Sequence, residues 1–234
     1  MFNNSKYGNM LTIILVVAIV AIIGIVAIIG YRMYSAYYVD TGATQAATQF
    51  EQSILQNNTN NINSNINNQI VAEQNDIKTD ISGIEDTTTG GNTGTSSQTT
   101  TKYKGFVVVG TIQIPKINLK YPILEKLSTT SLKTSVVLMY TAQGLNNPGN
   151  SVIIGHNYRN GTMFSDVDKL SNGDYIYITD GNGTKVRYTI YNIFRASGSE
   201  SEYITRNTNG KKEISLSTCT DDSKARTIVL AREG

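Results

Sequence analysis

The chain has 234 residues and a formal net charge of +2, and charged residues make up 16% of it. No basic patch of the kind that follows a nucleic-acid backbone stands out, so we exclude nucleic acid as a partner. The length suits one domain with additional segments, or at most two small domains.

An apolar segment without a single charge occupies residues 11–30. As an α-helix it would be about 30 Å long, which matches the hydrocarbon thickness of a bilayer. Several tyrosines follow it, as expected of an aromatic belt at the membrane interface. The competing interpretation is a cleavable signal peptide, but the apolar region of such a peptide is only about 7–15 residues long. We therefore predict an uncleaved transmembrane helix.

The orientation of this span depends on the positive charges beside it, Lys6 before it and Arg32 after it. Residues 1–10 form a short tail that carries Lys6 and the terminal amine, and positive charge favours the cytoplasmic side. We expect a single-pass protein of the cell membrane, with its N-terminus inside and the rest of the chain outside.

A polar segment at residues 31–102 follows, rich in Asn, Thr, Gln, Ser and Gly from about residue 41 onward. Such a composition buries too little apolar surface to offset chain entropy, so we expect residues 86–101 to be a disordered linker. If residues 41–101 were fully extended, they would span at most about 200 Å. We expect no catalytic chemistry in this segment.

One apolar pattern interrupts the polar segment. Isoleucines recur at spacings of three, four and seven residues, which places them on one stripe of a helix. These residues are Ile62, Ile66, Ile70, Ile77, Ile81 and Ile84. The stripe predicts an amphipathic or coiled stalk helix, and association with a partner or with a second copy is the alternative.

The third region, residues 103–234, contains short apolar runs rich in β-branched and aromatic residues, including FVVVGTIQI, SVIIGH, EISLSTC and RTIVLARE. The sequence DGNG at residues 180–183 predicts a tight hairpin turn. It also imitates the start of a calcium loop, but Lys185 stands where the loop needs Gly and Tyr191 where it needs Glu, so we predict no metal site. We expect a mostly β barrel or sandwich with short helices, which folds and acts without the span.

The chain has one cysteine, Cys219, and one histidine, His156. A lone cysteine closes no disulfide within the chain, so it is a small buried residue, a partner for another chain or a reactive thiol. Each of the two ends a strand-like run, and a rigid scaffold presents functional groups where strands meet loops. A thiol nucleophile also needs a base, and imidazole is the usual one.

A third candidate, Arg226, begins the strand-like run after Cys219. If the two runs form a hairpin with simple antiparallel register, the two side chains lie opposite each other, with Cβ atoms about 4.5–5.5 Å apart. The same register pairs Arg232 with Glu213, about 20 Å along the ribbon. A guanidinium stabilises a thiolate and donates to a developing oxyanion, and imidazole transfers protons to and from an amine. The three residues describe an acyl-transfer site that needs no cofactor.

Several motifs of the third region resemble those of sortases, the cysteine transpeptidases of the Gram-positive cell surface. SLSTCT with RTIVLARE is similar to the cysteine and arginine strands of the family, VIIGHNYRNGTMF to its histidine segment, and GTIQIPKINLKYPIL to its first barrel strands. The resemblance covers residues 110–233 and implies an eight-stranded β-barrel. By position it implies that Cys219 is the nucleophile, His156 the acid and base, and Arg226 the group that stabilises substrate and oxyanion.

The resemblance also implies a substrate and an acceptor. It implies cleavage of a C-terminal sorting signal, of the Leu-Pro-x-Thr-Gly type, on secreted proteins, and transfer to a peptidoglycan precursor or another amine. GHNYRNGTMF is similar to class B, but the short connection at residues 196–212 suits a compact class A or D barrel. A thiol peptidase that releases its product to water and a non-enzymatic surface β-domain on a stalk are the alternatives.

Overall fold

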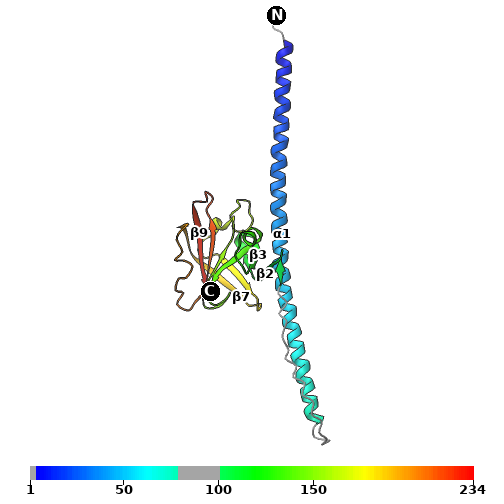
Figure 1. Ribbon diagram of the computed structural model, residues 1–234, viewed down its shortest axis with the longest axis vertical. Coiled ribbons are helices and arrows are strands. Elements are labelled where there is room, and N and C mark those ends of the chain that lie inside the picture. Colours follow the sequence, from blue (N-terminus) through cyan, green and yellow to red (C-terminus); the bar gives the residue numbers. More distant parts are fainter. Residues whose placement is uncertain (1–3, 79–100) are drawn as a thin grey trace.

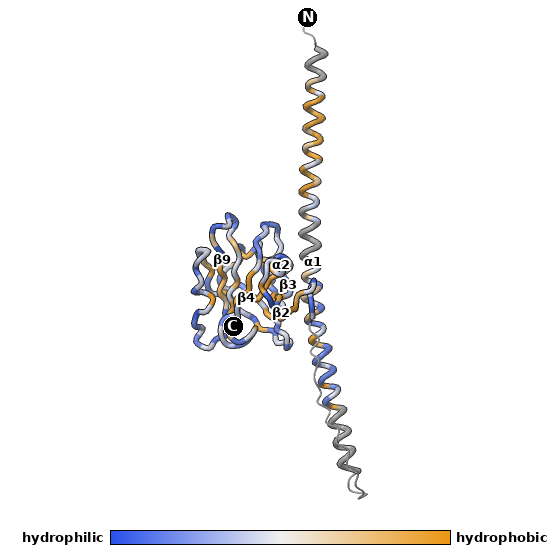
Figure 2. The backbone as a smooth tube through the Cα atoms, in the orientation of Figure 1, coloured by the Kyte–Doolittle hydropathy of each residue, from blue (hydrophilic) through white to orange (hydrophobic). Residues whose placement is uncertain are grey.

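The computed structural model describes residues 4–78 and 101–234 as a long helix beside a β-barrel (Figure 1). The helix, α1 (Asn4–Lys78), is continuous over 75 residues. It contains the predicted span, because Met10–Tyr31 is apolar and long enough to cross a membrane and none of this stretch is buried (Figure 2). Ile81, Ile84 and nearly all of the predicted linker at residues 86–101 lie outside the described residues.

The second part of the described chain is a barrel, as predicted. Its strands are β1 (Lys102–Tyr103), β2 (Phe106–Ile114), β3 (Leu119–Leu124), β4 (Val136–Thr141), β5 (Gly149–Ile154), β6 (Tyr175–Asp180), β7 (Lys185–Ser197), β8 (Lys212–Cys219) and β9 (Ala225–Glu233). Their order in the sheet is β1-β2-β3-β4-β5-β8-β9-β7-β6, and β6 pairs back with β2. Eight strands, β2 to β9, therefore close the barrel, and the two-residue β1 only extends β2.

The helices of the barrel region are short, as expected. They are η1 (Pro115–Ile117), α2 (Thr129–Thr134) and η2 (Val167–Lys169). Ser128 caps α2, because its hydroxyl accepts a hydrogen bond from the backbone N–H of Ser131, whose own hydroxyl accepts one from the backbone N–H of Ser128. This capping box stabilises a helix of only six residues.

The barrel strands alternate between two apolar clusters, as strands with two half-buried faces do. On β5, Ile153 belongs to the cluster that fills the barrel, whereas Val152 and Ile154 belong to a second cluster on the opposite face. Tyr203, from the connection between β7 and β8, is buried in that second cluster. The outer face of β5, β8 and β9 is thus covered by a loop.

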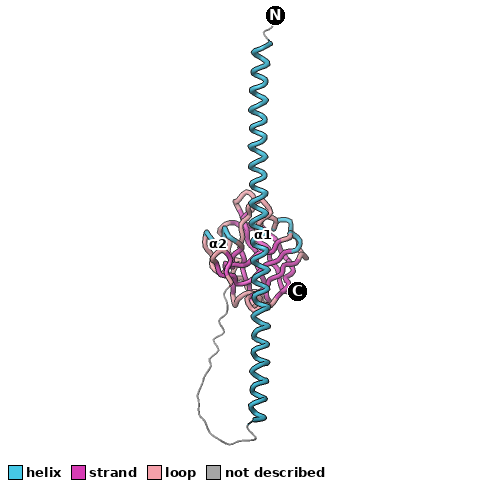
Figure 3. The backbone as a smooth tube through the Cα atoms, turned by 90° about the vertical axis from the view of Figure 1, so that its right-hand side faces the viewer, coloured by secondary structure: helices cyan, strands magenta, loops and turns pink. Residues whose placement is uncertain are grey.

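Helix α1 packs against the barrel beyond the span, over β2 and β3 (Figure 3). Four of its side chains at spacings of four, three and four residues are buried there: Ala43, Ala47, Phe50 and Ile54. The composition of this stretch predicted a polar linker, because two of the four buried residues are alanines among polar neighbours. Ile62 and Ile66, from the predicted stripe, lie in the helix, but their side chains are exposed.

An ionic and hydrogen-bonded contact accompanies this packing. Glu51 of α1 accepts hydrogen bonds from Lys120 Nζ at 2.9 Å and from Thr111 Oγ1 at 2.7 Å. Lys120 Nζ also donates to Thr48 Oγ1 at 3.2 Å. Burial raises the pKa of Glu51. The hydrogen bonds from Lys120 and Thr111, together with the positive charge of Lys120, lower it by more, so the pKa of Glu51 lies below the ordinary 4.5.

The lowered pKa of Glu51 predicts that acid weakens the contact between α1 and the barrel. A carboxyl group with a depressed folded pKa stabilises the fold fully above its unfolded pKa, here 4.5, and loses that contribution as the pH falls through the folded pKa. We expect Glu51→Gln to be less stable than wild type at neutral pH and to lose less stability on acidification. Chemical unfolding of the full chain in detergent at a series of pH values measures this difference, and parallel pH profiles would contradict it.

Candidate active site

The pairing of β5 with β8 brings His156 and Cys219 to one edge of the barrel. The two strands are parallel, with Ile154 opposite Ser217, and the backbone N–H of Gly155 donates to the Ser217 carbonyl at 3.2 Å. β5 ends at Ile154 and β8 at Cys219, so His156 follows the end of one strand and Cys219 ends the strand beside it.

The pairing of β8 with β9 adds Arg226 to this edge. Cys219 is the register partner of Arg226, and Glu213 that of Arg232, so the predicted hairpin register is confirmed. Ile214 and Leu216 of β8 belong to the barrel interior, and alternation places Cys219 on the opposite, outer face. The thiol and the guanidinium therefore share the outer face, and the segment that carries His156 follows the strand next to that of Cys219.

The backbone of His156 is held by the segment that follows it. Gly155 has no room for a side chain, because a Cβ there would lie 2.8 Å from the ring of Phe164 and 3.0 Å from Val136. The backbone N–H of Phe164 donates to the His156 carbonyl at 3.1 Å. The Tyr158 ring lies 4.9 Å from the His156 ring, at an angle of 40°. Gly155 and Phe164 thus fix the backbone position from which the His156 side chain extends.

The surroundings of His156 favour its neutral form. Burial lowers the pKa of His156 below the ordinary 6.5, and the positive charge of Lys133 in α2 lowers it further. At neutral pH most molecules therefore carry a neutral imidazole in the resting state.

The two arginines of β9 have different surroundings. Arg232 lies 3.9 Å from the centroid of the Tyr191 ring, and its Nε lies 3.9 Å from Glu213 Oε1. Glu213 is buried and also accepts hydrogen bonds from Tyr191 and Arg206. Arg226 is only partly buried and makes no side-chain hydrogen bond or ion pair within residues 4–78 and 101–234. Its guanidinium is therefore available to a substrate, whereas Arg232 belongs to a structural cluster.

Sequence reasoning missed one residue of this edge, Asn157. Its Nδ2 donates to the Cys219 carbonyl at 3.1 Å and to Asp221 Oδ1 at 2.8 Å, and its Oδ1 accepts from the backbone N–H of Arg159 at 3.0 Å. Asn157 thus ties the segment that carries His156 to the loop that follows Cys219. The only sequence signal was its place directly after His156, because the two partners of its Nδ2 lie more than sixty residues away.

The connection between β7 and β8 covers the outer face beside this edge. Asn150 Nδ2 donates to the carbonyls of Tyr203 and Ile204, both at 2.9 Å. The Tyr203 hydroxyl donates to Ser217 Oγ at 3.3 Å, two residues before the cysteine. Residues 198–211 contain turns and no helix, which matches the short connection noted in the sequence. The loop is therefore bonded to β5 and to β8 two residues before Cys219.

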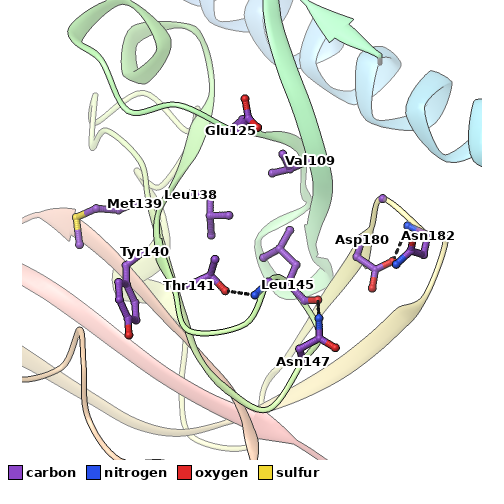
Figure 4. Close-up of a pocket in the computed structure, with 12 residues that line it drawn as sticks. Val109, Glu125, Leu138, Met139, Tyr140, Thr141, Leu145, Asn147, Asp180 and Asn182 are labelled. Atoms are coloured by element: carbon purple, nitrogen blue, oxygen red, sulfur yellow. Dashed lines mark hydrogen bonds between the residues drawn. The ribbon is translucent and has the colours of Figure 1, made fainter. Parts of the chain in front are cut away.

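Two cavities lie near the ends of the barrel. A cavity of about 50 Å³ behind the cysteine edge is lined by residues that include Asn157, Phe164, Thr218 and Asp221. A larger pocket of about 500 Å³ lies near the turn between β6 and β7, where Val109, Leu138 and Leu145 face its centre (Figure 4). The larger hollow contains neither the thiol nor the imidazole. Within the described residues, no three His, Cys, Asp or Glu side chains are grouped to hold a metal ion.

The fold and this edge define a class of protein: a closed β-barrel with one thiol, one imidazole and one unpaired guanidinium at the ends of neighbouring strands. The family model of the sortase domain matches residues 112–233, just over half of the chain. The chain belongs to the sortase family, as its motifs predicted.

Relatives of known name support this assignment. The chain is 30% identical over 125 residues to Sortase A of Bacillus anthracis, which covers 52% of this chain and 58% of that protein. It is 28% identical over 138 residues to Sortase A of Streptococcus agalactiae serotype III (strain NEM316), which covers 57% and 55%. The chain thus spans less than two thirds of the length of these two curated relatives.

Solved structures give the same family. A Clostridium perfringens Sortase D5 transpeptidase is 30% identical, with a TM-score of 0.50 over 54% of this chain and 79% of that one. Sortase A from Corynebacterium diphtheriae is 25% identical, with a TM-score of 0.50 over 55% of this chain and 61% of that one. The shared region is the barrel.

The surroundings of His156 predict the outcome of an NMR titration. It is the only histidine, so its ring protons give one titrating signal. We expect a midpoint below 6.5 in wild type, and an upward shift in Lys133→Gln that stops short of 6.5, because burial remains. Lys126→Gln removes the same charge from a residue that does not affect His156 and should leave the midpoint unchanged. A wild-type midpoint above 6.5 would contradict the described environment.

Asn157 should act as a positioning residue. Asn157→Asp keeps the size and the acceptor for the Arg159 N–H but cannot donate to the Cys219 carbonyl, and it puts a negative charge beside Asp221. We expect a fall in kcat/KM of about 10–100-fold, because small misplacements of reacting groups are costly. The rate at which iodoacetamide alkylates Cys219 should change in parallel, while the unfolding midpoint falls only slightly. Asp221→Asn, which keeps a partner for Asn157, serves as the matched control.

Proposed function

We propose that this chain is a membrane-anchored sortase that cleaves a sorting signal and transfers the acyl group to an amine. The observation that carries the proposal is the strand register: Cys219 is opposite Arg226, and His156 follows the end of the adjacent strand β5. A nucleophile, an oxyanion donor and a proton carrier from these three positions would suffice for acyl transfer. Membership in the sortase family supports the same chemistry.

The proposed first step forms a thioester. The Cys219 sulfur attacks the threonine carbonyl of a Leu-Pro-x-Thr-Gly-type signal, and the negative charge that develops on the carbonyl oxygen is stabilised by the Arg226 guanidinium. The imidazolium of His156 gives its proton to the leaving amine as the C–N bond breaks. The downstream peptide leaves with a free amine, and the upstream protein stays bound through a C–S bond.

The second step reverses the roles. An incoming amine attacks the thioester carbonyl, neutral His156 takes the proton that the amine loses, and the C–S bond breaks to release the thiolate of Cys219. A new amide replaces the one that was cleaved, so no net redox change occurs and no cofactor is consumed. The chemistry fits an amine of a peptidoglycan precursor as the acceptor. The helix at Met10–Tyr31 supports a single-pass anchor with the N-terminus inside.

The compact connection between β7 and β8 supports a class A or D enzyme over class B. Residues 198–211 contain no helix. Of the relatives described above, three are named Sortase A and one Sortase D5. The histidine segment GHNYRNGTMF is the feature that resembles class B.

A thiol peptidase is the rival within the same chemistry, because water can replace the amine in the second step. Excess glycine amide discriminates the two: the transferred product should dominate for a transpeptidase, and the hydrolysed product for a peptidase. The non-enzymatic alternative expects a buried, unreactive thiol, but Cys219 is partly exposed. Labelling the folded chain with a mild thiol reagent tests this alternative.

Substitutions at the three site residues should fail in different ways. Cys219→Ala should abolish both thioester formation and turnover. His156→Ala should lower the rate by about 10²–10⁴-fold through loss of proton transfer. Arg226→Lys keeps the charge but loses the planar fork, and we expect a loss on the order of 10²–10³-fold. Mass spectrometry of the acyl-enzyme and of the products measures each step.

Arg232→Lys is the matched control on the same strand. Arg232 lies in the structural cluster near the other end of the hairpin, so its replacement should change turnover little. An essential Arg232 together with a dispensable Arg226 would overturn the site assignment.

A further inference from the structure

Helix α1 connects the apolar span to the barrel without a break. Ala43, whose side chain is fully buried against the barrel, comes twelve residues after Tyr31, the end of the apolar stretch. At a helical rise of about 1.5 Å per residue, this spacer is about 18 Å long. A helix of this kind keeps its length and direction, whereas a flexible linker of the same residues does not.

The barrel is fixed to this helix by apolar and polar contacts together. Phe50 and Ile54 are buried in one cluster with Tyr103 and Val108 of the barrel. Burying side chains of this size stabilises the contact through the hydrophobic effect. The Glu51 carboxylate bonds with Lys120 and Thr111 within the same contact. Docking of this kind fixes a rotation about the helix axis as well as a distance.

The docking also determines which end of the barrel faces the span. The turn between β6 and β7 lies against the far part of the docked segment, because a Cβ on Gly183 would lie 2.8 Å from Ile54 Cγ2. From that turn β7 runs to Ser197, which pairs with Ala225 beside the Cys219 edge. In Figures 1 and 3 the C-terminus, where β9 ends, lies on the side away from the N-terminal half of α1. The beginning of β9, and with it Cys219, therefore lies on the side of the span.

We propose that α1 is a strut that holds the Cys219 edge toward the bilayer at a fixed height, so that the enzyme selects peptides whose cleavage site is held close to the membrane surface. The inference rests on the proposed function, since it assumes both the span and the cleavage of a peptide. A barrel on a free linker would sample many heights and would respond little to the position of the cleavage site. A rigid spacer confers preference only on substrates that match its reach.

The first experiment measures the geometry without any activity. The full chain is reconstituted in lipid nanodiscs, a fluorescent donor is attached to Cys219, the only cysteine, and acceptor lipids report energy transfer. We expect efficient transfer with a narrow distance distribution. Ala47→Glu, which places a charge at a fully buried contact, should lower the transfer and broaden the distribution. Gln49→Glu adds the same charge on the exposed face and should behave as wild type.

A second variant keeps this experiment decisive if Ala47→Glu does not fold. Insertion of Gly-Ser-Gly-Ser after Asp40 leaves the docked contact intact but interrupts the rigid spacer. It should also broaden the distance distribution. Wild-type transfer that is as low and as broad as that of the insertion variant would overturn the strut.

The second experiment measures selection. Peptides of the Leu-Pro-x-Thr-Gly type are anchored in the same nanodiscs through spacers of increasing length, and an unanchored peptide serves as reference. We expect the wild-type rate to peak at short spacers, and the ratio of short-spacer to long-spacer rates to fall to about one in the insertion variant. The rate on the unanchored peptide should be equal in both. A peak that survives the insertion would overturn the inference, whereas no activity on any peptide would overturn the proposed function itself.

Discussion

The candidate site depends above all on the register of three strands, β5, β8 and β9. Side chains on a strand alternate between faces, so a slip of one residue would turn Cys219 into the barrel interior and leave Arg226 on the other side of the sheet. Two ladders of backbone hydrogen bonds prevent this, one parallel and one antiparallel, and both continue to the last residues before the loops. The interior cluster reinforces them, because Ile214 and Leu216 fit only the inner face. The position of the thiol is thus a property of the whole barrel.

Electrostatic surroundings then distinguish the two arginines of β9. Arg226 and Arg232 are six residues apart on one strand and share a face, but only Arg232 meets a buried carboxylate and an aromatic ring. The cluster around Glu213 fixes the end of the β8–β9 hairpin that carries Arg232. At the other end, beside Cys219, the Arg226 guanidinium makes no ion pair with any described residue. For His156, burial and the charge of Lys133 act in the same direction and keep the ring neutral at rest.

The parts of this structure that were predictable from sequence were those that depend on local patterns. The hairpin of Cys219 and Arg226 needs only a short loop and period-two alternation, and its register was predicted correctly. The pairing that puts the strand before His156 beside the strand of Cys219 is parallel and joins segments more than fifty residues apart, which periodicity alone does not reveal. Asn157 was missed for the same reason. The docked segment of α1 was missed because Ala43 and Ala47 bury little area each, and their value lies in allowing the helix to approach β3 closely.

The docked segment has a consequence for how the soluble part of this protein behaves in isolation. A fragment that starts at Tyr103 would keep the eight barrel strands β2 to β9 but would open to water the surface that Phe50 and Ile54 now cover. Lys120 would lose its carboxylate partner, and the exposed side chains of β2 would form an uncovered apolar patch, a surface that favours self-association. The colloidal behaviour of such a fragment, and any dimer that it forms, would then reflect the removal of α1 rather than a property of the intact chain.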